Sequence, residues 1–90
     1  MVAIVSIVVK LMPESPSVDL EAIKKEATAR LEKEGAKQIS FEEKPIAFGL
    51  KSLHVQMAMP EEKGTDLVES IISKINGVSS ISIEDYRRLG

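Results

Sequence analysis

Two short stretches of the sequence carry residue types suited to binding chemistry. The first, residues 45–50, reads PIAFGL and contains Phe48, one of only two phenylalanines in the chain. The proline and glycine beside Phe48 predict a turn between two strands. An apolar side chain on a turn can serve as an exposed interface anchor, or it can fold back as a plug over the sheet edge. The second stretch, residues 86–89, reads YRRL and ends an acidic chain with two positive charges.

The usual constellations of catalytic residues are absent from the sequence. The five glycines are scattered, and none has the spacing of a phosphate-binding loop. No cysteine is present, and His54 is the only histidine, so thiolate sites and histidine-rich metal sites are excluded. We interpret His54 as an ordinary surface histidine, and the acidic pairs Glu42-Glu43 and Glu61-Glu62 as surface charge. We therefore expect a protein that is not an enzyme and that requires no metal and no cofactor.

Length and composition are those of one small domain. Ninety residues, 43% of them apolar, supply one modest core, so we expect residues 1–90 to form a single domain. A net charge of −2 and only 3% aromatic residues argue against direct binding of nucleic acid. The apolar start, residues 2–9, lacks the positive charges of a signal peptide and is far too short to span a bilayer. We therefore expect a cytoplasmic protein without membrane contact.

Hydrophobic alternation predicts the strands that must position these two stretches. Residues 2–12 form a long apolar run that prolines then interrupt, which suits a central strand. In residues 50–59 apolar and polar side chains alternate, which predicts one buried face and one open face. The buried face is predicted to hold Leu53, Val55, Met57 and Met59, and the open face to hold Ser52, His54 and Gln56. Further strands are predicted at residues 37–43 and 78–84, and residues 85–90 are interpreted as a tail.

Two amphipathic helices complete the pattern of elements. The first begins after a cap at Ser17 or Asp19 and runs to about residue 33. The second begins at the end of a loop formed by residues 60–64 and ends at the Asn-Gly pair of residues 76–77. Each helix must bury its apolar stripe against the sheet.

The element order β-α-β-β-α-β predicts a ferredoxin-like fold. This is an α/β (α+β) two-layer sandwich with a four-stranded antiparallel sheet of order 4-1-3-2 and two helices on one face. In such a sheet the turn at residues 45–49 and the end of the last strand lie at opposite ends, about 25–30 Å apart. A partner that touches both ends is therefore expected to be a large protein and not a small ligand.

Three separated motifs agree in order and spacing with one protein family. They are MPESP followed by VDLE within residues 12–21, PIAFGL at residues 45–50 and RRL at residues 87–89. Over its whole length the sequence resembles the archaeal translation elongation factor 1-beta family, whose members are guanine-nucleotide exchange factors of elongation factor 1-alpha. The middle motif, which continues as KSL, is also similar to the PIGFGIKKL segment of the eukaryotic exchange-factor catalytic domain.

The resemblance implies an exchange factor that binds the GDP-bound GTPase, opens its nucleotide site and stabilises the empty form. It further implies that Phe48 packs into the GTPase and that Arg88 approaches the Mg²⁺ and phosphate site. Arg88 stands where the eukaryotic pattern has lysine, and Ala47 where it has glycine. Because a guanidinium is not a compact ammonium, the role at the metal site can fall on Arg87 instead. The GTPase-binding residues that the resemblance implies are Ile46, Phe48, Gly49, Lys51, Tyr86, Arg87, Arg88 and Leu89.

A different class of function stays open at this point, because fold alone does not decide function. Small ferredoxin-like domains also serve as regulatory modules that bind a small ligand or form oligomers. In that case the open sheet face with Ser52, His54 and Gln56 is the binding surface, and Phe48 is a plug. An exchange factor, by contrast, is expected to be monomeric when free and to act only on its GTPase.

Overall fold

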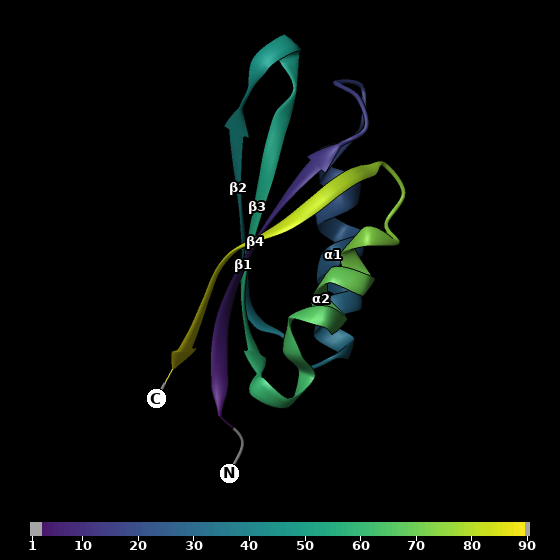
Figure 1. The fold of residues 1–90 in the computed structure, drawn as a ribbon. Coiled ribbons are helices and arrows are strands. Elements are labelled where there is room, and N and C mark those ends of the chain that lie inside the picture. The colour runs from purple at the N-terminus through teal and green to yellow at the C-terminus, as the bar shows by residue number, and fades with distance from the viewer. Residues whose placement is uncertain (1–2, 90) are drawn as a thin grey trace.

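The molecule contains a four-stranded sheet that is covered on one face by the two α-helices (Figure 1). The computed structural model describes residues 3–89. Its elements are β1 (Ile4–Pro13), α1 (Leu20–Lys33), β2 (Lys37–Pro45), β3 (Lys51–Pro60), α2 (Gly64–Ser73) and β4 (Val78–Leu89), with the short 3-10 helices η1 (Ala47–Gly49) and η2 (Glu61–Lys63). The sheet order is β2-β3-β1-β4, and its neighbouring strands are antiparallel. This is the predicted order 4-1-3-2 read from the other edge, so the ferredoxin-like fold is confirmed. Neither described helix is long and apolar enough to cross a membrane.

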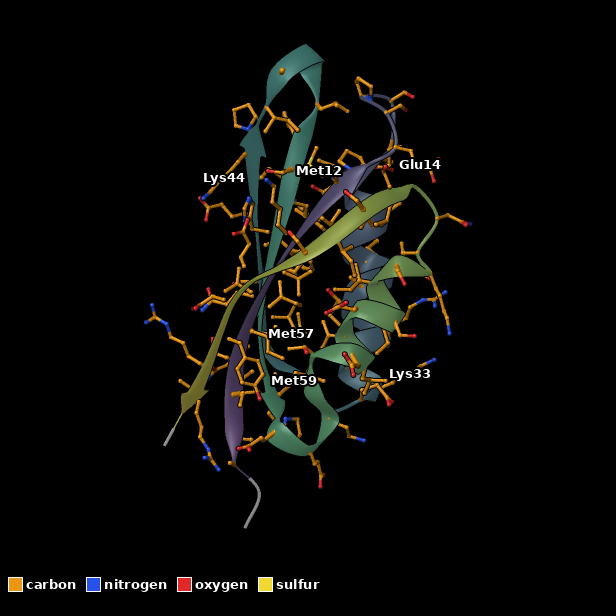
Figure 2. The ribbon with its side chains drawn as sticks, in the orientation of Figure 1. Met12, Glu14, Lys33, Lys44, Met57 and Met59 are labelled. Carbon is orange, nitrogen blue, oxygen red and sulfur yellow. The ribbon has the colours of Figure 1, made fainter. Side chains whose placement is uncertain are left out.

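The core lies between the sheet and the two helices. The central strands supply most of it, with Val5, Ile7, Val9 and Leu11 from β1 and Leu53, Val55, Met57 and Met59 from β3. Figure 2 shows Met57 and Met59 on the side of β3 that faces the helices. The helices add Ile23, Ala27 and Leu31 from α1 and Val68 and Ile72 from α2. The buried face predicted for residues 50–59 is therefore confirmed, because side chains with period two all reach the same layer.

Helix α1 begins at the second of its two predicted caps. The backbone N–H of Glu21 donates to the Asp19 carboxylate at 3.0 Å, which satisfies one of the free donors of the first turn. The Ser17 hydroxyl instead lies 2.9 Å from the hydroxyl of Ser15. Asp19 is therefore the cap, and the loop before it is held by its own serines.

Helix α2 is shorter than predicted. It ends at Ser73, and the Asn-Gly pair at residues 76–77 lies beyond it, in the turn that leads into β4. Gly77 adopts a φ of +94°, which disfavours any residue with a Cβ. A Cβ at this position would also lie 2.8 Å from Cγ1 of Val18, so both conformation and packing require glycine here.

The last strand is longer than predicted, and the expected tail at residues 85–90 is wrong for every residue that the structure describes. Strand β4 continues to Leu89, with Asp85 opposite Val8 and Leu89 opposite Ile4. A register shift between Val8 and Val9 places one extra residue in β4 and lets the pairing continue. Without residues 85–89 of β4, the backbone groups in the first half of β1 would be unpaired on the side away from β3. Gly90 lies outside the described residues.

The remaining boundaries differ only slightly from those predicted. Strand β2 runs two residues past the predicted end, to Pro45, and β3 is displaced by one residue at each end. The predicted start of the first strand at Val2 lies outside the described residues. The effect of these shifts is a longer β2–β3 hairpin, which extends beyond the helices at one end of the molecule (Figure 1). The largest dimension of the molecule is 45 Å.

Candidate functional site

The turn predicted at residues 45–49 forms the tip of the β2–β3 hairpin. The backbone N–H of Ile46 donates to the carbonyl of Leu50 at 2.8 Å, and the N–H of Leu50 donates to the carbonyl of Ala47 at 3.3 Å. Between them Gly49 adopts a φ of +76°. Ala47 is part of the short helix η1 and has an ordinary backbone, so the departure from glycine at this position is compatible with the turn.

Phe48 lies in η1, at the end of the hairpin. Whether its side chain is a plug or an interface anchor was left open by the sequence, and that side chain lies outside the described part of the structure. Ile46, two residues earlier, is 37% exposed and is one of the few large apolar side chains at the surface. The hairpin tip therefore presents at least one apolar group to solvent.

The first sequence motif lies beside the hairpin tip. Pro16, in the loop between β1 and α1, approaches Gly49 so closely that a Cβ on Gly49 would lie 4.0 Å from the proline Cβ. Figure 1 shows this loop beside the hairpin, at the same end of the sheet. Two of the three motifs, at residues 12–21 and 45–50, thus come together, which no pattern in the sequence indicated.

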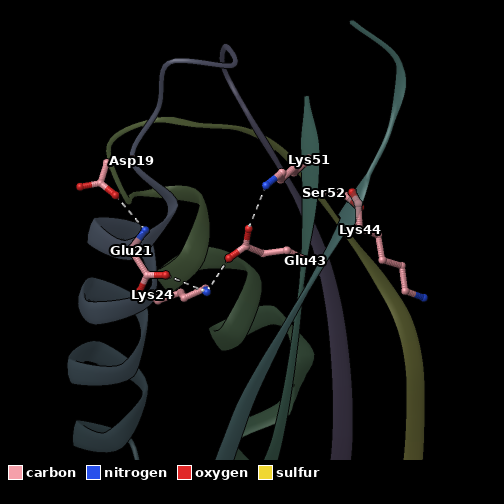
Figure 3. Close-up of polar contacts among 7 residues, drawn as sticks. All are labelled: Asp19, Glu21, Lys24, Glu43, Lys44, Lys51 and Ser52. Carbon is pink, nitrogen blue, oxygen red and sulfur yellow. Dashed lines mark hydrogen bonds and ion pairs between the residues drawn. The ribbon is translucent and has the colours of Figure 1, made fainter. Parts of the chain in front are cut away.

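A charged cluster joins the hairpin to helix α1 (Figure 3). The Lys24 ammonium of α1 donates to the Glu43 carboxylate of β2 at 2.7 Å and to Glu21 at 3.1 Å. Lys51, a predicted site residue, has its Nζ 3.9 Å from the other oxygen of Glu43. The hydrogen bond from Lys24, helped by the charge of Lys51, lowers the pKa of Glu43. The hydrogen bonds to Glu43 and then to Glu21 raise the pKa of Lys24. Glu43 is exposed, as predicted, and its ion pair with Lys24 links the hairpin to α1 at the surface.

The two C-terminal arginines lie on opposite faces of the sheet. Arg88 pairs with Val5, whose side chain belongs to the core, so Arg88 is on the helix-covered face. Arg87 pairs with Ser6 and is on the open face. Because successive residues of a strand point to opposite sides, a partner that approaches one face meets only one of these two charges.

Each arginine has an acidic neighbour that sequence analysis did not assign to it. Nε of Arg88 lies 3.0 Å from Oε2 of Glu61 in η2, and Nε of Arg87 lies 3.0 Å from Oδ2 of Asp85. The pair of Arg87 is local, two residues apart on one strand face, and could have been predicted once the strand was known. The pair of Arg88 spans two elements far apart in the sequence, and only the strand register brings it together.

Apolar surface accompanies the arginines at this end of the sheet. Tyr86 and Leu89, both predicted site residues, are each 46% exposed. Leu89 pairs with Ile4, which is also exposed, and both line a hollow of about 480 Å³ together with Ala58 and Pro60. The YRRL stretch therefore combines exposed apolar and positive side chains. Because it belongs to a paired strand and not to a tail, the backbone of these residues is fixed.

The structure does not bring the two predicted groups of site residues together. Arg88 pairs with Val5, which pairs with Met59 near the end of β3, whereas β3 begins at Lys51 beside the hairpin tip. The eight residue steps from Lys51 to Met59 correspond to about 26 Å along the strand. Figure 1 likewise shows the hairpin tip and the end of β4 at opposite ends of the molecule. The predicted separation is confirmed.

The open face of the sheet has fewer accessible polar side chains than the hypothesis of a ligand-binding regulatory module requires. His54 and Gln56 line a hollow of about 280 Å³, but Ser52 is only 1% exposed. Its hydroxyl donates to the carbonyl of Lys44 at 3.4 Å and lies 3.2 Å from Nε2 of His54. Ser52 therefore lies on the open face, as predicted, but it is buried there by its own hydrogen bonds and neighbours and is not available to a ligand.

The geometry defines a ferredoxin-like domain whose candidate contact groups lie at the two ends of its sheet and not in a deep cavity. Residues 6–89 match the family model of the EF-1 guanine nucleotide exchange domain. The chain belongs to this family of exchange-factor domains. The resemblance drawn from the three motifs is thereby confirmed.

Curated relatives match nearly the whole chain. Elongation factor 1-beta of Methanothermobacter thermautotrophicus is 49% identical over 82 residues, which are 90% of this chain and 91% of that protein. Elongation factor 1-beta of Metallosphaera sedula is 44% identical over 88 residues, 96% of each chain. Elongation factor 1-beta of Methanobrevibacter smithii is 44% identical over 81 residues, 89% of this chain and 90% of that protein. The family match over residues 6–89 includes both ends of the sheet.

Proposed function

We propose that this protein promotes the release of GDP from translation elongation factor 1-alpha, and thereby allows GTP to reload, by contacting that GTPase with both ends of its sheet. The observation that carries the proposal is the family match over residues 6–89, which includes the hairpin tip and the C-terminal arginines. A contact surface about 26 Å long is also too extended for a small ligand and suits a protein partner.

At the hairpin end, the proposed contact is Phe48, supported by Ile46. A phenylalanine side chain that becomes buried in a partner contributes about 1.5–3 kcal/mol. The ion pair of Glu43 and Lys24 links the hairpin to α1 before the partner binds and favours one arrangement of the two. Such preorganisation reduces the entropy that is lost on association.

At the other end, the proposed contact is Arg88, which approaches the Mg²⁺ and phosphate site of the GTPase. A positive charge next to Mg²⁺ repels the metal and competes for the phosphate oxygens that it neutralises. We assign this role to Arg88 and not to Arg87, because the two point to opposite faces and the family motif aligns Arg88 with the eukaryotic lysine. Gly49, Lys51, Tyr86 and Leu89 complete the proposed contact surface.

Exchange then follows from linkage between the two ligands of the GTPase. Each tenfold loss of GDP affinity requires the exchange factor to bind the nucleotide-free state about 1.4 kcal/mol more tightly than the GDP-bound state. By the same linkage, GDP weakens the binding of the exchange factor by the factor by which the exchange factor weakens the binding of GDP, and GTP acts in the same way through its own coupling. The factor is therefore released when nucleotide returns.

The test is the release of a fluorescent GDP analogue from elongation factor 1-alpha, measured with increasing amounts of this protein. Phe48→Ala and Arg88→Ala are compared with wild type, and Phe48→Leu and Arg88→Lys are their conservative controls. Wild type is expected to accelerate release, both alanine variants to lose most of the acceleration, and both conservative variants to retain more of it. If only one alanine variant loses the acceleration, the proposed function stands, but the other residue is not part of the contact site. A wild-type protein that does not accelerate release at any concentration would refute the proposal.

A further inference from the structure

The C-terminal arginine is not free in the isolated protein. Nε of Arg88 lies 3.0 Å from Oε2 of Glu61, a residue of η2 at the end of β3. This oxygen is inaccessible to solvent, although the Glu61 side chain as a whole is 39% exposed. Among the residues that the structure describes, it accepts no hydrogen bond, so the guanidinium contact is ionic. The positive charge of Arg88 thus balances the negative charge of the inaccessible Glu61 oxygen.

Glu61 is itself held in place from the backbone. Its N–H donates to the carbonyl of Ala3 at 2.7 Å, which ties the start of η2 to the chain just before β1. The carboxylate therefore cannot follow the arginine far from the sheet. When Arg88 turns toward a partner, the Glu61 carboxylate loses this ion pair, and breaking the pair opposes the movement of the arginine.

We propose that Glu61 is a positioning residue that restrains Arg88 in the free protein and opposes its transfer to the partner. The inference rests on the proposed exchange function, because it assigns a competitor to the arginine of that same site. The phosphate groups of the GDP bound to the GTPase must displace the Glu61 carboxylate before Arg88 can act. Glu61 thereby favours release of the exchange factor once its partner has rebound nucleotide.

The expected size of the effect is limited by the exposure of the pair. The Arg88 side chain is 67% exposed, and ion pairs at such sites contribute little, since water and salt screen them. Removing the negative charge of Glu61 should therefore raise kcat/KM for GDP release by about two- to fivefold, and fivefold corresponds to about 1 kcal/mol.

The experiment compares Glu61→Gln, which keeps the shape and removes the charge, with Glu62→Gln, an exposed neighbour that loses the same charge. Both are combined with Arg88→Ala, and GDP release from elongation factor 1-alpha is measured for all. The fast motion of the Arg88 Nε–H group is measured by NMR in the free protein. Glu61→Gln is expected to raise kcat/KM and to loosen Arg88. Glu62→Gln is expected to change neither by more than a factor of about 1.5, and in the Arg88→Ala background Glu61→Gln should have no effect.

The outcomes separate this inference from the function on which it rests. If wild type does not accelerate GDP release, the proposed function fails and the inference fails with it. If wild type is active but Glu61→Gln leaves kcat/KM unchanged or lowers it, the inference alone is overturned. A gain of equal size in the Arg88→Ala background would also overturn it, because the effect would then not pass through the arginine.

Discussion

Removing both proposed contact groups at once tests whether the two ends of the sheet act separately. Phe48 lies at the tip of the hairpin, and Arg88 pairs through Val5 with Met59 at the far end of β3. The strand length between these ends is about 26 Å. Substitutions more than about 10 Å apart, without shared contacts, usually add in free energy to within 0.3–0.5 kcal/mol. We therefore expect the double variant Phe48→Ala/Arg88→Ala to lose the product of the two single losses, to within a factor of about two.

The single losses follow from the chemistry of each group. Losing a buried phenylalanine contact of about 1.5–3 kcal/mol lowers kcat/KM for GDP release by about 10- to 150-fold. Losing a charge-assisted contact of about 1.5–3 kcal/mol at Arg88 has a similar effect. The assay is stopped-flow release of the GDP analogue at enzyme-like substoichiometric ratios, with thermal unfolding of each variant as a check on folding. Lys25→Ala, on the exposed side of α1, controls for the loss of one positive charge.

A double variant whose kcat/KM is no lower than that of the more impaired single variant would refute the reasoning. Such a result would mean that the two residues act at one place or in one step, which is incompatible with their separation at opposite ends of the sheet. A combined loss that exceeds the product more than tenfold would contradict it equally, because that would require the two ends to be coupled.

Three further predictions concern the elements that hold these ends. Gly77→Ala should lower the free energy of unfolding by about 2–4 kcal/mol, from backbone strain plus a steric clash. Gly64→Ala, with φ of +72° but no neighbour within 4 Å, should show only the strain, and thermal unfolding compares the two. Asp19→Ala should cost about 1 kcal/mol as a lost helix cap and Ser17→Ala nearly nothing, measured by urea denaturation. Because the pKa of Glu43 is lowered in the folded state, its contribution to stability is present above its ordinary pKa and disappears as the pH falls through the lowered value. The stability difference between wild type and Glu43→Gln should accordingly vanish in acid, and persistence of that difference below the lowered pKa would contradict the assignment.

The middle of each strand was predictable because burial there depends on the local pattern alone. The alternation in residues 50–59 predicted the core face of β3, and the apolar run at the start of the chain predicted a central strand. Ser52 shows the limit of this approach, since its place on the open face was foreseen but its burial was not. The Ser52 hydroxyl hydrogen-bonds to Lys44 on the neighbouring strand β2, and β2 covers it. The alternation of residues within β3 alone contains no information about that neighbour.

The C-terminal end was mispredicted for a related reason. Asp85, Tyr86 and the two arginines have the composition of a solvated tail, and nothing in their own sequence demands a strand. They pair because β1 begins early and leaves its backbone groups unpaired on that side. The contact between Arg88 and Glu61 depends in turn on this pairing, so it could not be predicted before the register was known.

The candidate contact groups lie where the sequence pattern is weakest, at the ends of elements, and the core lies where it is strongest. This arrangement has a mechanical consequence. The central strands β1 and β3 are paired over eight positions from Ile4 opposite Pro60 to Leu11 opposite Leu53, and their helix-facing side chains are buried. The backbone distance between the hairpin tip and residue 88 is therefore set largely by strand length. In the proposed function, each end therefore contacts its own part of the GTPase, and each contributes to exchange by binding the nucleotide-free state more tightly than the GDP-bound state.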